Sequence, residues 1–303
     1  MRTILITGGS GLIGKRLTRL LLKKGYAVNH LSHNTQWHPN PRYMVYKWNV
    51  PLGQIDEKCL ENVDAIIHLA GESIAGKRWT PRRKEQIIKS RTDSTRLLYK
   101  LIRETNNQQV KTFISASAMG FYGNRENELL TEESLPGNSF LSRTCLEWEK
   151  AVDEGIGLGL RIVKLRTGLV LAEEGGALPE IASPIKHGFG SVLGNGRQWV
   201  SWIHIRDVIR MYNFALENEN MRGAYNMAAP YAVRNSELTK TIAKVLNKKL
   251  WLPPVPAFGL KLILGEMSNL LLDSTHLSSE KIQKAGFKFE FPTLNAALKE
   301  IYY

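Results

Sequence analysis

Three glycines near the start of the chain have the spacing of a phosphate-binding loop. Gly8, Gly11 and Gly14 follow a short apolar run and precede an amphipathic stretch. In such a strand–loop–helix unit the first glycine permits a tight turn, the second lets the main chain approach a pyrophosphate, and the third lets the helix pack closely on the strand. The first amide groups of the helix would point at the phosphates, so the segment predicts a dinucleotide site. The residues expected to line it are Gly8, Ser10, Gly11, Leu12, Ile13 and Gly14.

The end of the next apolar run bears on which dinucleotide is bound. A domain that prefers NAD usually has Asp or Glu at this place, where the carboxylate bonds the ribose 2′-hydroxyl. This chain has Ser32, His33 and Asn34 instead, which can donate to a 2′-phosphate, and Lys15 and Arg16 stand early in the first helix. The missing carboxylate favours NADP as the cofactor, with NAD as the alternative. A loop residue without any ligand is the other interpretation of His33.

Apolar runs alternate with amphipathic stretches along the first half, which is the pattern of an α/β protein. Short apolar strands separated by helices imply a parallel sheet covered on both faces, so we predict a doubly wound Rossmann domain over residues 1–170. Glycine-rich loops and further helices predict a smaller, mostly helical substrate-side region over 171–303, packed on the first and ending in a cap from about residue 250. The expected strands are residues 3–7, 27–32, 65–70, 111–116, 160–165 and 225–228, and the expected helices are 11–24, 81–103, 143–153, 178–186, 205–217, 235–246 and 296–303.

Composition excludes several classes of protein. Hydrophobic residues make up 43% of the 303 and charged residues 23%, an ordinary globular balance. The two cysteines, Cys59 and Cys145, lie far apart, so we expect neither a disulfide framework nor a metal site, and a reducing cytoplasm fits. The opening apolar run is too short for a signal peptide, and the most apolar long stretch, residues 251–272, is broken by prolines and charges. We therefore expect a cytoplasmic protein without a membrane partner.

The chain is strongly basic. Lysine and arginine outnumber acidic residues by 41 to 28, which gives a net charge of +13 at pH 7. Nucleic acid or an anionic membrane surface is one interpretation of this excess. Because no nucleic-acid motif accompanies the charge, we expect instead a basic surface on a protein that acts on a small-molecule substrate. Several of the cations cluster over residues 77–91, where a phosphorylated cofactor or an acidic substrate could use them.

A series of short motifs runs through the whole chain. In order they are Gly8xxGly11xxGly14, His68-Leu69-Ala70-Gly71-Glu72, Arg78-Trp79-Thr80, Ser90-Arg91 with Thr95, Ser115-Ala116-Ser117, Tyr122-Gly123, Cys145 with Trp148-Glu149, Leu165-Arg166-Thr167-Gly168-Leu169-Val170-Leu171, Ser201-Trp202-Ile203-His204 and Ala285-Gly286-Phe287-Lys288-Phe289. The series resembles the extended short-chain dehydrogenases/reductases. Within them it is similar to the atypical branch called epimerase family proteins, or NAD-dependent epimerase/dehydratase-like proteins, including their small C-terminal region. The number and order of the motifs make the match specific.

The resemblance implies a larger cofactor site and an altered catalytic set. It adds Leu69, Ala70, Gly71, Arg91, Ser115, Ala116, Gly168 and Leu169 to the cofactor-binding residues. In active members of the superfamily a tyrosine is the general acid/base, and a lysine four residues later lowers its pKa. One alignment puts Phe140 and Thr144 at these positions, and a shift by one residue puts Leu141 and Cys145 there. Neither places a phenol where it is needed, so proton transfer by a Tyr–Lys pair from this position is excluded.

Other side chains are candidates for the missing chemistry. The resemblance retains Ser117 as the serine that holds the substrate oxygen. Tyr122 and Cys145 are the candidate replacements for the acid/base, although a packing role is the alternative for each. Arg91 occupies the place of the relay asparagine, where its guanidinium could clamp a phosphate or carboxylate or form a surface salt bridge. Arg166 is a weaker candidate for the same anion-binding role.

Two further residues have both a functional and a structural interpretation. Glu72 is either an acid/base at the mouth of the site or the partner of Arg78 or Arg91. His204 either reaches the substrate cleft or anchors a loop to the core.

Two functions from different classes are compatible with these residues. The first is an NADP-dependent oxidoreductase or nucleotide-sugar epimerase-like enzyme with a non-standard proton donor, whose substrate lies near Ser117, Tyr122 and Trp202. The second is a non-catalytic dinucleotide-binding or redox-sensing protein. The intact glycine loop favours cofactor binding in both. The altered catalytic set favours the second function, and the retained serine mildly favours the first.

Overall fold

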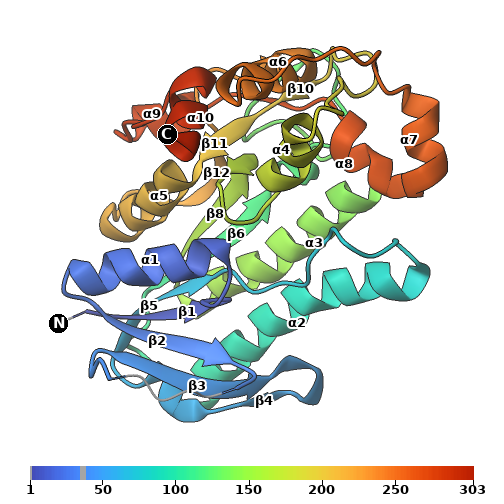
Figure 1. Ribbon diagram of the computed structural model, residues 1–303. Coiled ribbons are helices and arrows are strands. Elements are labelled where there is room, and N and C mark those ends of the chain that lie inside the picture. The colour runs from blue at the N-terminus through green and yellow to red at the C-terminus, as the bar shows by residue number, and fades with distance from the viewer. Residues whose placement is uncertain (1, 35–38) are drawn as a thin grey trace.

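The structure, a computed structural model, describes residues 2–34 and 39–303. Its central sheet has eight strands, and helices lie on both faces (Figure 1). The strands of this sheet are β1 (Thr3–Thr7), β2 (Ala27–Ser32), β3 (Tyr43–Asn49), β4 (Gln54–Ile55), β5 (Val63–His68), β6 (Thr112–Ala118), β8 (Arg161–Thr167) and β12 (Gly223–Met227). The α-helices are α1 (Leu12–Lys23), α2 (Pro81–Glu104), α3 (Phe140–Asp153), α4 (Leu178–Lys186), α5 (Ile205–Glu217), α6 (Asn235–Val245), α7 (Ala257–Leu264), α8 (Asn269–Leu272), α9 (Glu280–Lys284) and α10 (Leu294–Tyr302).

The order of the strands reverses at β1. The sheet reads β12-β8-β6-β5-β1-β2-β3-β4, and every neighbouring pair is parallel except β3 with β4. From β1 the chain builds outward first through β2 and β3 and then, on the other side, through β5, β6 and β8. This is the doubly wound Rossmann arrangement that the alternating pattern predicts. In such sheets ligands bind outside the carboxyl ends of the strands at the point of reversal, here between β1 and β5.

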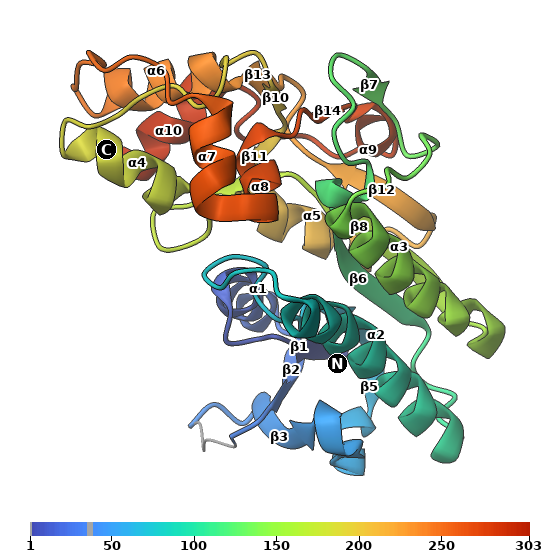
Figure 2. The same ribbon diagram turned by 90° about the vertical axis from the view of Figure 1, so that its right-hand side faces the viewer.

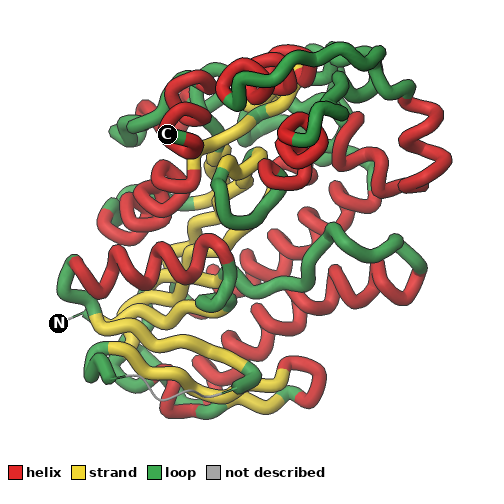
Figure 3. Tube along the Cα trace, in the orientation of Figure 1, coloured by secondary structure: helices red, strands yellow, loops and turns green. Residues whose placement is uncertain are grey.

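Two apolar clusters join the sheet to its helices. On one face α1 and α5 contribute Leu17 and Val208 to a core that includes Ile6 of β1. On the other face α2 and α3 contribute Leu98 and Val152. Strands buried between two layers are apolar along their whole length, which explains why the first strand could be recognised as an uninterrupted run. Figure 3 shows the helices of both layers flanking the strands.

Side-chain caps explain where the two long helices of the second layer begin. The Thr80 hydroxyl accepts the main-chain N–H of Arg83, and the Ser139 hydroxyl accepts that of Ser142. A capping oxygen of this kind satisfies an amide group that has no partner inside the helix. The cap at Ser139 places the start of α3 at Phe140, three residues before the expected start of that helix at 143.

The strands β3 and β4 were not expected from the sequence. They form the edge of the sheet beyond β2, and most of their side chains are half-buried or exposed. Met44 in β3 is an exposed apolar side chain, whereas Trp48 is buried. A half-exposed edge strand therefore lacks the apolar run by which the central strands were recognised.

The chain after residue 170 contributes to the sheet and adds a second layered body. β12 lies beyond the expected boundary and pairs with β8 as the edge strand of the sheet. Helices α4, α6 and α10 share a third apolar cluster, and Figure 2 shows them gathered on the side of the molecule away from β3. Short strand pairs complete this part: β9 (Leu169–Leu171) with β11 (Trp202–His204), β10 (Trp199–Val200) with β13 (Val233–Arg234), and β7 (Leu129–Leu130) with β14 (His276–Leu277). The division at residue 170 stays a prediction. None of the helices in the described ranges is long and apolar enough to cross a membrane.

Candidate functional site

The glycine-rich loop has two positions at which a Cβ would collide with main-chain atoms. Gly8 has a φ of +68°, and a Cβ there would lie 2.9 Å from main-chain atoms of Leu69 and Ala70. The N–H of Gly11 donates to the carbonyl oxygen of Gly8 at 3.0 Å, and α1 begins directly after Gly11. A Cβ on Gly14 would lie 2.4 Å from the same carbonyl oxygen. The tight turn expected of Gly8 and the close packing expected of Gly14 are therefore both present.

A threonine at the end of β1 holds the neighbouring loop in place. The Thr7 hydroxyl accepts the main-chain N–H groups of Leu69 and Ala70, each at 3.1 Å, and lies 2.7 Å from Nδ1 of His68. Its single proton is thus assigned to His68 Nδ1. The ring then donates from Nε2 to the Ser94 hydroxyl, whose own proton goes to the carbonyl oxygen of Ser90. This buried chain of hydrogen bonds fixes the segment after β5 beside the glycine-rich loop.

A second buried histidine supports the glycine-rich loop from β2. The Thr18 hydroxyl donates to the carbonyl oxygen of Gly14 at 2.8 Å, so it accepts from Nε2 of His30 at 2.7 Å. Nδ1 of His30 then accepts from the Tyr43 hydroxyl at 2.8 Å. Both ring nitrogens are engaged by neutral groups, and burial lowers the pKa of His30 to about 4. A Cβ on Gly9 would lie 2.2 Å from this ring. The neutral imidazole is thus part of the floor of the loop.

The buried histidines predict acid sensitivity. The unfolded chain binds a proton at His30 near pH 6.5, whereas the folded chain does so only near pH 4. Stability is therefore fully present above pH 6.5 and is lost as the pH falls toward 4. Between pH 7 and pH 5 we expect a loss of about 2 kcal/mol from this ring. Burial also lowers the pKa of His68, which adds a loss of the same sign. Urea unfolding at a series of pH values measures the effect, and an NMR titration of His30 near pH 6.5 in the folded protein would contradict it.

The residues expected at the adenosine end lie at the carboxyl end of β2. Ser32 is half-buried, and His33 and Asn34 are exposed. The hydroxyl of Ser32 accepts the N–H of Asn34 at 3.3 Å. In α1, Lys15 is exposed, whereas Arg16 forms an ion pair of 3.5 Å with Glu174, which lies in the loop after β9. The three residues after β2 present hydroxyl, imidazole and amide groups and no carboxylate.

Arg91 joins α2 to the loop after β5. Its guanidinium donates to the carbonyl oxygens of Ile87 and Glu72 at 2.9 and 3.0 Å and lies over the ring of Trp148. A Cβ on Gly71 would lie 3.0 Å from the guanidinium carbon, so Arg91 packs closely against the main chain at Gly71. The carboxylate of Glu72 pairs with Arg83 rather than with Arg78 or Arg91. No carboxylate lies within 4.0 Å of Arg91 in the described chain, so the surface salt bridge considered for it does not form there.

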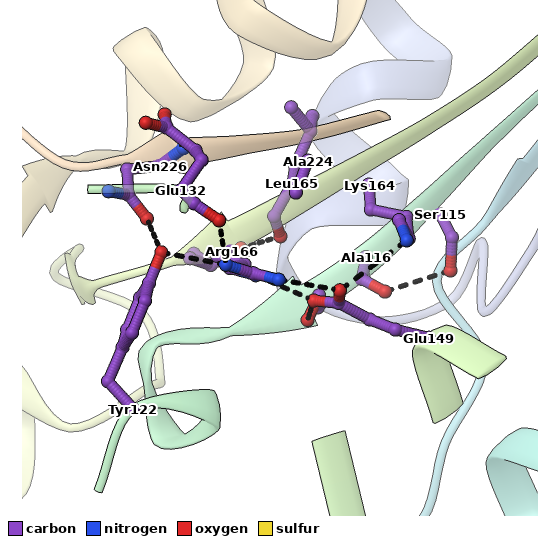
Figure 4. A network of polar contacts seen from close by, with 12 residues as sticks. Ser115, Ala116, Tyr122, Glu132, Glu149, Lys164, Leu165, Arg166, Ala224 and Asn226 are labelled. Carbon is purple, nitrogen blue, oxygen red and sulfur yellow. Dashed lines mark hydrogen bonds and ion pairs between the residues drawn. The ribbon is translucent and has the colours of Figure 1, made fainter. Parts of the chain in front are cut away.

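A buried polar network lies at the carboxyl end of β6 and β8 (Figure 4). Ser117 donates to Oε1 of Glu149 at 2.7 Å. Arg166 donates to both oxygens of Glu149 at 2.8 and 2.9 Å and to the Tyr122 hydroxyl at 2.9 Å. The Tyr122 hydroxyl in turn donates to Oδ1 of Asn226 at 2.7 Å. The hydroxyl protons of Ser117 and Tyr122 are thus both directed at protein acceptors.

The electrostatics of this network keep Glu149 ionised. Burial alone would raise the pKa of the Glu149 carboxyl. The hydrogen bonds and charge of Arg166, with Lys164 at 3.6 Å, outweigh burial and bring that pKa below its ordinary value. Burial raises the pKa of Tyr122 to about 12 despite the nearby Arg166. These contacts favour a structural role for Tyr122 over the catalytic one expected from the sequence.

Cys145 is a buried thiol that faces the end of β6. A Cβ on Gly120 would lie 3.2 Å from Cβ of Leu141 and 3.7 Å from Sγ of Cys145. Leu141 and Cys145 are therefore the pair of α3 that faces the segment after Ser117. Burial and the nearby Glu149 raise the pKa of Cys145 to about 12, so the thiol stays protonated at neutral pH. That environment favours packing over thiolate chemistry.

The remaining predicted residues fall into two groups. Ser115 and Gly168 are buried, and both bond main-chain groups. The Ser115 hydroxyl donates to the carbonyl oxygen of Ala116, and the N–H of Gly168 donates to the carbonyl oxygen of Met227. Trp202 and His204 are buried, and His204 lies 2.8 Å from the carboxylate of Glu300 in α10. This contact favours the structural interpretation of His204 over a place in the substrate cleft. Ser10 is exposed, whereas Ala116 and Leu169 are half-buried.

Glu149 and Asn226 were not singled out as functional from the sequence. Glu149 appeared only within a motif, and Asn226 appeared only within the strand expected over residues 225–228. One signal was available for Glu149, since it stands four residues after Cys145 and so on the same face of α3. An acidic residue on the inner face of a helix requires a buried partner, and that partner is Arg166.

The doubly wound sheet and the glycine-rich loop at its point of reversal define a Rossmann-type nucleotide-binding protein. Residues 4–228 match the model of the NAD dependent epimerase/dehydratase family, and residues 255–301 match a domain of unknown function, DUF1731. The chain therefore belongs to the NAD dependent epimerase/dehydratase family, and the resemblance drawn from its motifs is confirmed.

Named relatives and solved structures agree with this assignment. The chain is 38% identical to epimerase family protein YfhF of Bacillus subtilis over 98% of this chain and 97% of that protein. It is 35% identical to epimerase family protein SAR0825 of Staphylococcus aureus over 99% of each. The crystal structure of human epimerase family protein SDR39U1 with NADPH superposes with a TM-score of 0.84 at 28% identity, over 99% of both chains. A nucleoside-diphosphate sugar epimerase from Corynebacterium glutamicum gives 0.79 at 31% identity, over 99% of this chain and 58% of that one.

Proposed function

We propose that this protein binds NADP(H) at the loop Gly8–Gly14 and acts as an oxidoreductase or epimerase-like enzyme of the short-chain dehydrogenase type. The observation that carries the proposal is the cradle formed by Gly8 and Gly14, where a Cβ on either residue would collide with main-chain atoms. Such a loop at the amino end of α1 leaves the first amide groups of the helix free to receive a diphosphate. The human relative named above was crystallised with NADPH, which supports the same cofactor here.

The described residues fit the parts of such a cofactor. Amides of Leu12 and Ile13 would hold the diphosphate, and Ser32, His33 and Asn34 would donate to the 2′-phosphate. Leu69 and Ala70, held by Thr7, and the adjacent Gly71 would line the adenine side. Bound NADP(H) supplies a hydride donor or acceptor.

Other residues would act toward the reacting end of the cofactor. Arg91, already fixed to the carbonyl oxygens of Ile87 and Glu72, would offer its remaining N–H groups to a phosphate or ribose hydroxyl. The hydroxyl of Ser117 donates its proton to Glu149, so its oxygen would accept a hydrogen bond from a substrate hydroxyl.

One observation favours a second function, a non-catalytic dinucleotide-binding or redox-sensing protein. The hydroxyls of Ser117 and Tyr122 are both bonded inside the buried network, and Cys145 keeps its proton at neutral pH. Leu141 and Cys145 face the end of β6. Leu141 has no titratable group and Cys145 keeps its proton, so neither can exchange a proton with a substrate at neutral pH. Under this second function the cofactor would bind without turnover.

Two measurements separate these functions. Calorimetric titration with NADPH and NADH tests binding, and absence of heat with both would refute each function. A panel of carbonyl compounds with NADPH, followed by absorbance of the reduced nicotinamide, then tests turnover. Oxidation that depends on the carbonyl compound and disappears in Ser117→Ala supports the enzyme. Tight binding without oxidation of NADPH by any compound of the panel supports the binding protein.

The preference for NADP over NAD can be reversed at the end of β2. In Ser32→Asp a carboxylate would repel the 2′-phosphate of NADPH and accept a hydrogen bond from the 2′-hydroxyl of NADH. We expect the ratio of NADPH to NADH affinity to fall by at least about tenfold. Asn247→Asp, in the exposed turn after α6, makes the same charge change far from the loop and serves as the control. An unchanged ratio in Ser32→Asp would place the 2′-phosphate elsewhere.

A further inference from the structure

A cavity of about 390 Å³ lies at the edge of the sheet opposite the glycine-rich loop. Its walls come from the amino ends of β1, β5, β6 and β8, from the end of α5 and from the turn before β12. These strands are parallel, so their amino ends share one edge and their carboxyl ends the other. The five residues of β1 therefore separate this cavity from the proposed cofactor site, and the proposed function makes no use of it.

Cationic side chains outnumber carboxylates around this cavity. The charged residues of its lining are Arg2, Lys111, Arg161, Arg222, Asp64 and Glu219. Asp64 accepts the main-chain N–H of Thr3 at 2.8 Å, and Glu219 lies 3.5 Å from Arg2. Within residues 2–34 and 39–303, no carboxylate comes within 4.0 Å of the other three cations. Lys111 and Arg222 are exposed at the rim, so their N–H groups are available to a ligand.

Arg161 places a buried positive charge in the wall. Its guanidinium donates to the carbonyl oxygens of Ala215, Asn218 and Met221, each at 3.1 Å, at and just beyond the end of α5. Carbonyl oxygens at a helix end favour a cation but carry only partial charges. Burial lowers the pKa of Arg161, and the nearby Arg222 lowers it further. The cations at this edge therefore repel one another, and a bound anion would relieve that repulsion.

We propose that this cavity binds a compact oxyanion with two or more negative charges, of the phosphate or polycarboxylate class. Arg222 offers paired N–H donors that match the geometry of such an oxyanion, and Lys111 adds a point charge beside them. The volume falls within the range of small-molecule sites, which begins at about 300 Å³. Arg161 and Arg2 would contribute their charge, and Asp64 would limit how deeply an anion enters.

The test is a titration of the full chain with inorganic pyrophosphate and, separately, with citrate at low ionic strength. We expect Lys111→Gln/Arg222→Gln to weaken binding of the preferred anion by at least about tenfold, because two charged donors are lost. Glu219→Gln, which removes a competing carboxylate, should strengthen it. The matched control is Lys240→Gln/Lys244→Gln, which removes two exposed charges from α6 and should leave the affinity unchanged. Raising the salt concentration should weaken binding to the cavity.

The outcomes decide both the site and the source of the anion. Binding of pyrophosphate alone assigns phosphate compounds, and binding of citrate alone assigns polycarboxylates. Equal affinity in the wild-type chain and in Lys111→Gln/Arg222→Gln, or no heat with either anion, would overturn the proposal. Circular dichroism checks that the variants fold. NADPH affinity measured in the same variants should stay at the wild-type value, because neither substitution touches the glycine-rich loop.

Discussion

Gly14→Ala is expected to abolish binding of NADPH. The added Cβ would lie 2.4 Å from the carbonyl oxygen of Gly8 and 2.6 Å from Cα of Gly9, and both are main-chain atoms that cannot rotate away. The loop must therefore open or α1 must shift, and either movement misdirects the amide groups that would hold the diphosphate. We expect the affinity to fall by more than about a hundredfold, with an overpacking cost of about 1–3 kcal/mol in the free energy of unfolding. Calorimetric titration and urea unfolding measure the two effects.

Gly11→Ala and Gly157→Ala separate loss of binding from loss of fold. A Cβ on Gly11 would lie 3.3 Å from the carbonyl oxygen of Gly8, a tight contact that a small shift relieves, so we expect a smaller loss of stability than in Gly14→Ala. The same Cβ would stand where the main chain must approach the diphosphate, so binding should still be lost. A Cβ on Gly157 meets no atom within 4 Å, and this variant should bind NADPH normally. Wild-type affinity in Gly14→Ala would show that the cofactor does not use this loop.

Glu149→Gln is expected to produce the largest loss of stability among the substitutions considered. The variant removes the negative charge that pairs with the buried guanidinium of Arg166 and sets an amide NH2 group against one of the guanidinium donors. Removing one partner of a buried ion pair costs about 3–5 kcal/mol, because the other charge stays in a region of low polarity. Urea unfolding followed by tryptophan fluorescence measures the change in the free energy of unfolding.

Two further variants test this interpretation of the network. Asp153→Asn removes a half-exposed carboxylate 2.7 Å from Lys164, and we expect it to cost less than about 1 kcal/mol. Combining Glu149→Gln with Arg166→Met removes both charges, so the double variant should recover part of the stability that Glu149→Gln loses. A loss of under about 1 kcal/mol in Glu149→Gln, equal to that of Asp153→Asn, would contradict the structural role assigned to Glu149.

Much of the first half of the fold could be predicted because its signals are local. β1, the glycine turn and α1 are adjacent in sequence, and each is recorded by a short pattern of residue types. The same is true of α2, which Thr80 and Pro81 begin. The edge strand β3 was missed because most of its side chains are half-buried or exposed, so polar and apolar residues mix along it.

The candidate site was predictable on its cofactor side and not on its catalytic side. Gly8 and Gly14 act through their own main chain, so residue type and spacing are enough to assign them. Ser117 and Tyr122 act through what their hydroxyls contact, and those acceptors lie 32 and 104 positions away. Sequence spacing does not record such distances, which is why both were taken as catalytic candidates.

The sequence by itself determined the layered α/β fold and the loop that turns from β1 into α1, because these depend on apolar periodicity and on main-chain conformation within a few residues. Only the tertiary structure decided which polar groups neutralise one another. It directs Ser117 and Tyr122 into a buried network around Arg166, and at the opposite edge no carboxylate of the described residues lies within 4.0 Å of Lys111 or Arg222. The physical reason is that Coulomb energy depends on separation in space and on burial, and both are set when distant strands pair.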